Sequence, residues 1–286
     1  MTDGRLPNFL VIGAMKAGTG SLALYLRSHP DIYMPARKEL WFFNDPSNPI
    51  KDLDWYRRQF ADAGGERAVG EATPTYAAYP LWQGVSERVA KVLPEARLIY
   101  LIREPVARIR SHYVMMLRSG RQVLPLDEAI ERDPRFIQQS QYAMQIERYL
   151  RFFPRESILL ILSEDLRTKR KETMARIFSF LEVDPDWEHR VFNRELNTTV
   201  GENERNLNAW IRRKMARNND MEQIPTYRMM MRLGKAVINR ARTRALRRAE
   251  IVVSPETREL IHSRLRADVN ELRRLMPPDF DGWGIA

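Results

Sequence analysis

The sequence contains no cysteine among its 286 residues. This absence excludes disulfide bonds, thiolate metal sites and a cysteine nucleophile, and it fits a reducing cytosol, so we expect a cytoplasmic protein. No stretch approaches the roughly 18 to 20 consecutive apolar residues of a membrane span. The first apolar run, Phe9–Ile12, is too short for a signal peptide. The four histidines are scattered along the chain, so the sequence predicts no metal site.

Acidic residues are outnumbered, because 47 Lys and Arg stand against 37 Asp and Glu and give a net charge of +10. Such an excess fits a polyanionic or phosphorylated partner. Residues 201–250 hold thirteen of the basic residues and only five acidic ones, so this segment carries +8 of the net charge. Its apolar residues recur at helical spacing, which predicts one or two basic amphipathic helices. Their charged face could be ordinary solvated surface, a lid over an anionic ligand, or a patch that docks on a membrane or polyanion.

Short apolar runs alternate with amphipathic segments along most of the chain. The runs predict buried strands over residues 9–12, 97–102 and 157–162. Helices are predicted over 21–28, 106–117, 127–153, 171–181 and 255–276. Strands alternating with helices indicate an α/β fold: a three-layer, P-loop-like sandwich with a mostly parallel central sheet between helices. With no repeat and no Gly/Ser linker, residues 1–286 are predicted to form one domain, in which 201–250 is a basic helical insertion or lid.

A glycine-rich segment, Gly13–Leu22, follows the first predicted strand and opens the first predicted helix. Free backbone N–H groups at such a helix start point at an anion, and small residues let a phosphate come close. Lys16 adds a mobile positive charge, and Thr19 and Ser21 add hydroxyl donors. The segment is not a Walker A loop, because its lysine precedes Gly18 by two positions and no Lys-Ser/Thr pair follows. The alternative is that the glycines only permit a tight turn.

The second predicted strand ends in Arg103, at the edge where open α/β sheets bind ligands. Ser111 lies about two helical turns further along. Together the two side chains could grip a second phosphate. Each also has a plain structural alternative, which is a surface pair with Glu104 for the arginine and an ordinary helix-face position for the serine.

Several ordered motifs resemble those of sulfotransferases that use 3′-phosphoadenosine 5′-phosphosulfate (PAPS). Lys16–Leu22 with His29-Pro30 is similar to their 5′-phosphosulfate loop, and Arg103–Tyr113 is similar to their 3′-phosphate motif. Within that family, Lys38–Phe43 is most similar to the heparan sulfate N- and 3-O-sulfotransferase branch, and the lack of cysteine suggests a bacterial-type soluble enzyme. The likeness covers roughly residues 8–200 and 254–284.

The resemblance implies roles at the matching positions. The 5′-phosphosulfate would be held by a loop of seven residues: Lys16, Ala17, Gly18, Thr19, Gly20, Ser21 and Leu22. Lys16 would also follow the charge onto the bridging oxygen as the S–O bond breaks, and Arg103 and Ser111 would clamp the 3′-phosphate. Glu39 falls on the family's catalytic base by its register against Phe42-Phe43, although its residue type alone favours a surface carboxylate paired with Lys38 or Arg37. The acceptor is expected to contact Arg37, Lys38 and Trp41.

The sequence departs from the family pattern at two places. The glycan branch often has a lysine where this chain has Ala72. The basic loop that closes over PAPS before the last helix is not recognisable, and we expect Arg247 and Arg248 of the basic segment to replace it. His112, directly after Ser111, is expected to have a packing role rather than to act as a base.

The predicted function is in-line transfer of a sulfuryl group from PAPS to a hydroxyl, with an amine as second choice, of a glycan or small natural product. Neither a metal nor a nucleic acid partner is expected. Two alternatives stay open, namely a P-loop-type nucleotide kinase and a non-catalytic basic module that binds nucleic acid or an acidic membrane through residues 201–250. The sequence predicts neither the acceptor's identity nor the oligomeric state.

Overall fold

The computed structural model describes residues 4–47, 51–119, 121, 124–193 and 251–285. Over these residues one sheet of five strands has the order β2-β3-β1-β4-β5, and every neighbouring pair is parallel. The strands are Phe9–Gly13 (β1), Ile32–Tyr33 (β2), Ala68–Ala72 (β3), Arg97–Ile102 (β4) and Ile158–Leu162 (β5). Because helices cover both faces, β1 and β3 are buried along their whole length.

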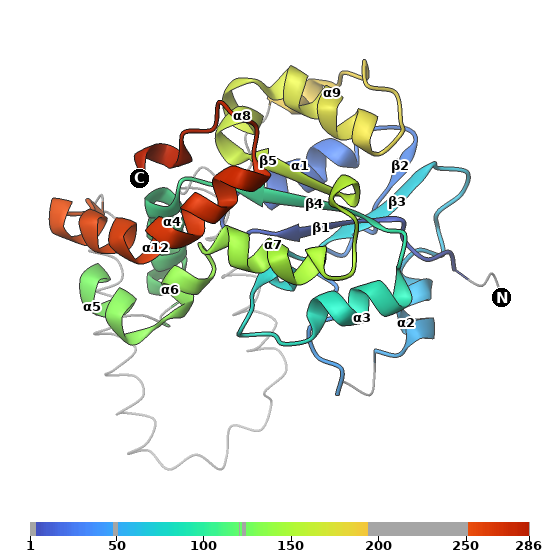
Figure 1. Ribbon diagram of the computed structural model, residues 1–286. Coiled ribbons are helices and arrows are strands. Elements are labelled where there is room, and N and C mark those ends of the chain that lie inside the picture. The colour runs from blue at the N-terminus through green and yellow to red at the C-terminus, as the bar shows by residue number, and fades with distance from the viewer. Residues whose placement is uncertain (1–3, 48–50, 120, 122–123, 194–250, 286) are drawn as a thin grey trace, which may run out of the picture.

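Helices pack on both faces of this sheet, which confirms the predicted three-layer α/β sandwich (Figure 1). On one face lie α1 (Thr19–Leu26), α8 (Ser163–Thr168) and α9 (Arg170–Phe180). On the other face lie α3 (Val85–Val92) and α7 (Tyr142–Leu150). The shorter elements are α2 (Leu53–Arg58), η1 (Pro74–Ala77), η2 (Arg155–Ser157), η3 (Arg190–Asn193) and η4 (Gly282–Gly284).

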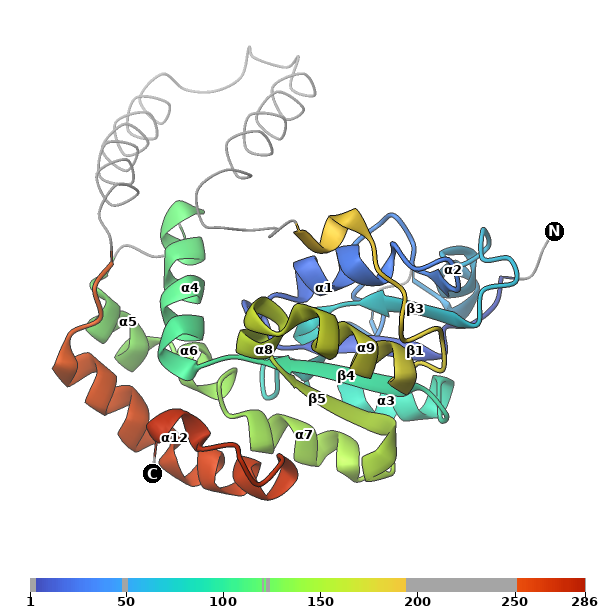
Figure 2. The same ribbon diagram turned by 90° about the horizontal axis from the view of Figure 1, so that it is seen from above.

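A second group of helices lies beyond the carboxyl ends of the strands (Figures 1 and 2). It contains α4 (Pro105–Arg118), α5 (Leu126–Arg132), α6 (Arg135–Gln138) and α12 (Pro255–Leu275). Their apolar side chains form a core of their own, which includes Ile109, Phe136, Ile261 and Leu265. Asp268 of α12 accepts the backbone N–H groups of Ala143 and Met144 at 3.1 and 2.9 Å, and so joins α12 to the start of α7.

The predicted strands and most predicted helices are present, with ends shifted by one or two residues. The helix predicted over 127–153 is wrong, because the chain forms α5, α6 and α7 there. Asp133 is extended because the ring of Pro134 disfavours a helical conformation in the residue before it, and a second break falls at Gln141. Among the helices described, none has the length and apolar character that crossing a bilayer requires. The basic segment 201–250 lies outside the described residues.

Candidate active site

The glycine-rich segment forms a tight turn between β1 and α1. A Cβ atom on Gly13 would lie only 2.5 Å from the buried ring of Tyr100, so the turn packs directly on β4. Gly18 caps α1 in the left-handed conformation at φ 98°, which glycine adopts without steric cost. Lys16 is half-buried and also has a positive φ, of 73°. The N-terminus of α1 therefore opens at this turn, in the arrangement that suits a phosphate or sulfate group.

Arg103 lies at the carboxyl end of β4 and reaches the same turn. Its Nη1 donates a hydrogen bond to the backbone carbonyl of Lys16 at 3.1 Å, and its own carbonyl accepts from the Tyr142 hydroxyl at 2.7 Å. After β1 the chain builds β2 and β3 on one side of that strand and then crosses to β4 on the other. The ends of β1 and β4 are thus the topological switch point, where open α/β sheets bind their ligands.

The α4 helix continues from Arg103 and carries Ser111, which is half-buried. The side chain of Glu104 caps this helix by accepting the N–H groups of Val106 and Ala107 at 2.9 and 2.6 Å. The carboxylate of Glu104 is therefore directed to the helix start, while Arg103 is directed to the β1 turn. This geometry differs from the surface pair that sequence alone allowed.

His112 is buried on α4 beside Phe136, with ring centroids 4.6 Å apart. Burial lowers the pKa of His112 to about 3, and the nearby positive charge of Arg108 contributes in the same direction. The imidazole is therefore neutral at physiological pH and packs in the second core.

Glu39 lies in the connection that follows β2, in an unusual backbone conformation. Glu39 and Trp41 both have positive φ values, 61° and 52°, while Leu40 between them is fully buried. The Glu39 carboxylate lies 3.4 Å from the Lys38 ammonium, and its side chain is 30% exposed. The ion pair that sequence allowed as an alternative is thus present, and it leaves the carboxylate accessible.

A second carboxylate, Glu71 at the end of β3, lies buried beside this connection. Three hydroxyl groups donate hydrogen bonds to it: Tyr56 at 2.9 Å, Thr73 at 2.7 Å and Tyr76 at 2.7 Å. Burial raises the pKa of Glu71, and these hydrogen bonds act against that rise. Sequence reasoning gave Glu71 no role. The available signal was a charged residue within a segment otherwise free of charge, Ala68–Ala78.

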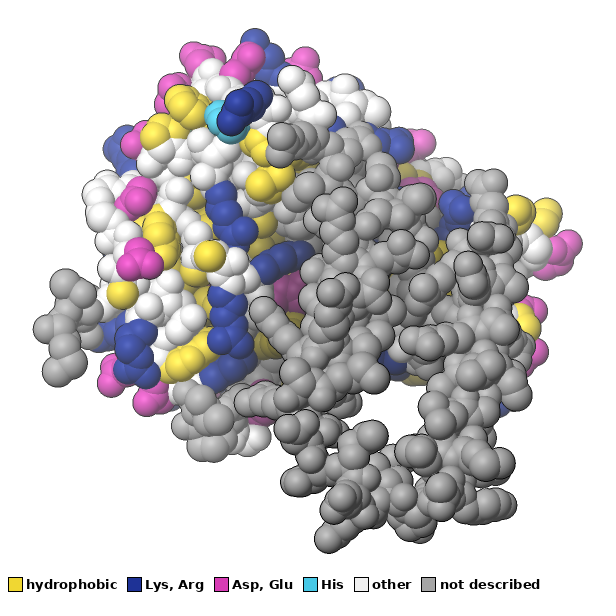
Figure 3. Space-filling view, turned by 180° about the vertical axis from the view of Figure 1, so that it is seen from behind, with side chains coloured by type: hydrophobic (Ala, Val, Ile, Leu, Met, Phe, Trp, Pro, Cys, Tyr) yellow, Lys and Arg dark blue, Asp and Glu magenta, His cyan; other side chains and the backbone are white. Residues whose placement is uncertain are grey.

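Cationic and aromatic side chains surround the same connection. The Lys51 ammonium donates to the Leu40 carbonyl at 2.7 Å and lies 5.3 Å from the ring centroid of Trp55, and the Arg37 guanidinium lies 5.6 Å from that centroid. Burial lowers the pKa of Lys51, with a further contribution from Arg37. Trp41 is 45% exposed. Figure 3 shows Lys and Arg side chains gathered in a band on the face of the molecule opposite that of Figure 1.

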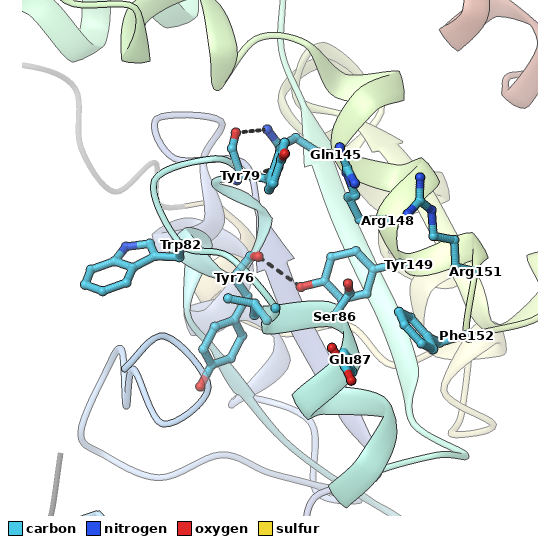
Figure 4. Close-up of a pocket in the computed structure, with 12 residues that line it drawn as sticks. Tyr76, Tyr79, Trp82, Ser86, Glu87, Gln145, Arg148, Tyr149, Arg151 and Phe152 are labelled. Carbon is cyan, nitrogen blue, oxygen red and sulfur yellow. Dashed lines mark hydrogen bonds between the residues drawn. The ribbon is translucent and has the colours of Figure 1, made fainter. Parts of the chain in front are cut away.

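A separate pocket of about 170 Å3 lies between η1, α3 and α7 (Figure 4). The Tyr149 hydroxyl donates to the Tyr76 carbonyl at 3.0 Å, and the Gln145 amide donates to the Tyr79 carbonyl at 2.7 Å. None of the described residues that line the pocket is a predicted site residue. Within the described parts of the chain, no group of three or more His, Cys, Asp or Glu side chains is placed to hold a metal ion. Arg247 and Arg248 lie outside those parts.

Comparison with known proteins identifies the family. The family model described as "Sulfotransferase domain" matches residues 6–232, so the chain belongs to the sulfotransferase domain family. Among solved structures, a sulfotransferase from Alicyclobacillus acidocaldarius is similar with a TM-score of 0.72 and 26% sequence identity. That similarity covers 98% of this chain and 99% of the other.

Curated relatives carry sulfotransferase names as well. Mouse heparan sulfate glucosamine 3-O-sulfotransferase 5 is 27% identical over 69% of this chain and 59% of its own length. The mouse bifunctional heparan sulfate N-deacetylase/N-sulfotransferase 3 is 31% identical over 66% of this chain and 24% of its own. The membrane-associated sulfotransferase kil1 of Dictyostelium discoideum is 40% identical over 38% of this chain and 22% of its own. The chain therefore spans less than two thirds of the length of each of these relatives.

Proposed function

We propose that this protein transfers the sulfuryl group of PAPS to a hydroxyl group of an acceptor. The observation that carries the proposal is the Arg103–Lys16 contact at the switch point of a sulfotransferase-family fold. PAPS is anionic at two places. We assign its 5′-phosphosulfate to the turn Lys16–Leu22 at the start of α1, because Arg103 contacts that turn at the edge of the sheet. We assign its 3′-phosphate to Arg103 and to Ser111, which follows on α4.

In this mechanism the acceptor oxygen attacks the sulfur in line with the bond to the bridging oxygen. As the new S–O bond forms, the old one breaks and its electron pair goes to the bridging oxygen of the leaving adenosine 3′,5′-bisphosphate. The Lys16 ammonium stabilises that charge, and the Glu39 carboxylate takes the proton of the acceptor hydroxyl. Most of the rate enhancement then comes from positioning and fixed charge.

The acceptor is proposed to be a glycan or small natural product, with an amine as the second choice of nucleophile. The names of two relatives, which mention heparan sulfate, support the glycan. The exposed indole of Trp41 and the cations of Arg37 and Lys38 stand within two residues of Glu39 in the chain, and we propose that they contact the acceptor. Arg247 and Arg248 remain proposed donor contacts, residues 201–250 a proposed insertion or lid, and the cytoplasm the proposed compartment.

The test is transfer of label from PAPS carrying sulfur-35 in its sulfuryl group. The full chain is incubated with a panel of polysaccharides, hydroxylated small molecules and their amine analogues, in buffer that contains a metal chelator. We expect label in at least one acceptor together with an equal amount of adenosine 3′,5′-bisphosphate. The proposal is wrong if no compound takes up label and no bisphosphate forms, or if Lys16→Ala transfers label at the wild-type rate.

A further inference from the structure

Three consecutive backbone N–H groups directly after Glu39 converge on the buried carboxylate of Glu71. The N–H of Leu40 is close enough to that carboxylate to act against the rise in the pKa of Glu71. The next two N–H groups reach it through one hydroxyl each: Trp41 donates to Thr73 Oγ1 at 3.5 Å, and Phe42 donates to Tyr76 Oη at 3.1 Å. Both of these hydroxyls donate onward to Glu71 at 2.7 Å.

The directions of these hydrogen bonds follow from the proton that each hydroxyl donates to Glu71. A hydroxyl has one proton, so one that donates to Glu71 presents its lone pairs to the backbone N–H groups of the connection. An ionised carboxylate accepts only and offers about four lone-pair sites. Glu71 receives three hydroxyl donors, from Tyr56, Thr73 and Tyr76, and the nearby N–H of Leu40 also favours its charged form. These contacts favour the ionised form of Glu71 and act against the rise in its pKa that burial causes.

The connection around Glu39 and Trp41 has a strained backbone, so other contacts must hold it in place. The left-handed backbone of Glu39 and Trp41 costs about 1–3 kcal/mol at each residue and persists only where the surroundings fix it. Lys51 fixes the carbonyl of Leu40, to which its ammonium donates at 2.7 Å. Arg88 fixes the far end, since its Nε and Nη2 both donate to the carbonyl of Phe43, at 2.9 and 2.6 Å.

We propose that Glu71 is a positioning residue for sulfuryl transfer, which acts through Thr73 and Tyr76 to hold the Glu39 carboxylate in place for the acceptor. The inference rests on the proposed function, because it assigns the proton transfer to Glu39. Loss of the cluster should lower kcat, since the base is then misplaced, while the donor is bound by residues that follow β1 and β4. Glu71 itself touches neither donor nor acceptor in this account.

Tyr76 and Tyr56 offer a matched pair of substitutions that test this proposal. Tyr76 and Tyr56 are both buried and both donate to Glu71, but of the two only the Tyr76 hydroxyl accepts an N–H from residues 40–42. Tyr56 contacts that segment through its ring, which stacks on Phe42 at 4.2 Å between centroids, and phenylalanine keeps that contact. Tyr76→Phe therefore removes the link to the segment, whereas Tyr56→Phe removes a donor to Glu71 alone.

The experiment compares Tyr76→Phe, Tyr56→Phe and Glu71→Gln in the full chain with PAPS and an acceptor from the panel. We expect kcat to fall about tenfold or more in Tyr76→Phe and Glu71→Gln and less than threefold in Tyr56→Phe. The Kd for adenosine 3′,5′-bisphosphate should change less than twofold in all three. Equal losses of kcat in the two tyrosine variants would overturn the proposal, because the cluster would then serve stability alone.

Amide hydrogen exchange gives a readout that does not depend on turnover. Exchange at Leu40, Trp41 and Phe42 should quicken at least tenfold in Tyr76→Phe, while β1 and β4 keep wild-type rates. Unchanged exchange at these three amides would also overturn the proposal. If the wild-type chain turned over no acceptor, the proposed function would fail by itself, and faster exchange would still show the link between Glu71 and this segment.

Discussion

The guanidinium of Arg103 donates a hydrogen bond to the backbone carbonyl of Lys16, a residue 87 positions earlier in the chain. The contact exists because β1 and β4 are parallel neighbours whose carboxyl ends meet at the same edge of the sheet. It joins the guanidinium of Arg103 to the backbone of Lys16, and we assign the side-chain charges of these two residues to opposite ends of the donor. On the proposed assignment, donor binding depends on how the turn after β1 closes against the end of β4.

Replacing Arg103 with alanine should weaken donor binding. On the proposed assignment, the variant loses a charge-assisted hydrogen bond to the 3′-phosphate as well as the contact to the Lys16 carbonyl. Such bonds contribute about 1.5–3 kcal/mol, so Kd for adenosine 3′,5′-bisphosphate should rise about 10- to 100-fold in a calorimetric titration. The matched control is Arg97→Ala. Arg97 is the first residue of β4, so it lies at the end of the strand away from Arg103, and it pairs with Glu182. Equal affinities in both variants would show that the phosphate assignment is wrong.

Replacing Glu39 with glutamine should abolish most turnover and leave donor affinity unchanged. Glutamine keeps the size of the side chain but cannot accept the acceptor's proton, so kcat should fall about 10²- to 10⁴-fold. Glu95→Gln is the control, because Glu95 is exposed and lies just after α3. Initial rates with saturating PAPS provide the measurement. Turnover of the Glu39 variant within threefold of wild type would remove this carboxylate as the base.

His112 should make the protein sensitive to mild acid. Its folded-state pKa of about 3 lies below the ordinary value of 6.5, so only the unfolded chain takes up this proton as pH falls from 7.5 to 5.5. Wild type should lose ~1.4 kcal/mol more of its unfolding free energy over that range than His112→Asn does. Urea titrations at the two pH values measure the difference. An equal loss in both proteins would mean that folding leaves the imidazole pKa unchanged.

A methyl group on Gly70 should destabilise the sheet. A Cβ atom there would lie 2.4 Å from the ring of Phe9, which is fully buried in β1. Gly70→Ala should lower the free energy of unfolding by about 1–3 kcal/mol. Gly65→Ala is the control, because a Cβ atom on Gly65 meets nothing within 4 Å. Chemical denaturation of both variants tests this, and a Gly70 variant as stable as its control would contradict the packing.

Local patterns were sufficient to predict β1, β4 and β5 and the glycine-rich turn, since each is a continuous run with its own hydrophobic or glycine signature. They missed β3, because Gly70 and Glu71 interrupt its apolar character, and β2, because it has only two residues. The long helix predicted from residue 127 failed at Pro134, where backbone geometry outweighed hydrophobic spacing. The Glu71 cluster could not be predicted, because tertiary packing brings the hydroxyls of α2 and η1 to one carboxylate.

The most direct test of the account is calorimetric titration of the full chain with adenosine 3′,5′-bisphosphate in the absence of magnesium. The account predicts saturable one-site binding, with adenosine 5′-monophosphate binding at least tenfold more weakly because it lacks the 3′-phosphate. The Arg103→Ala variant should lose most of that preference. Magnesium-dependent binding of ATP, together with no binding of the bisphosphate, would contradict the account.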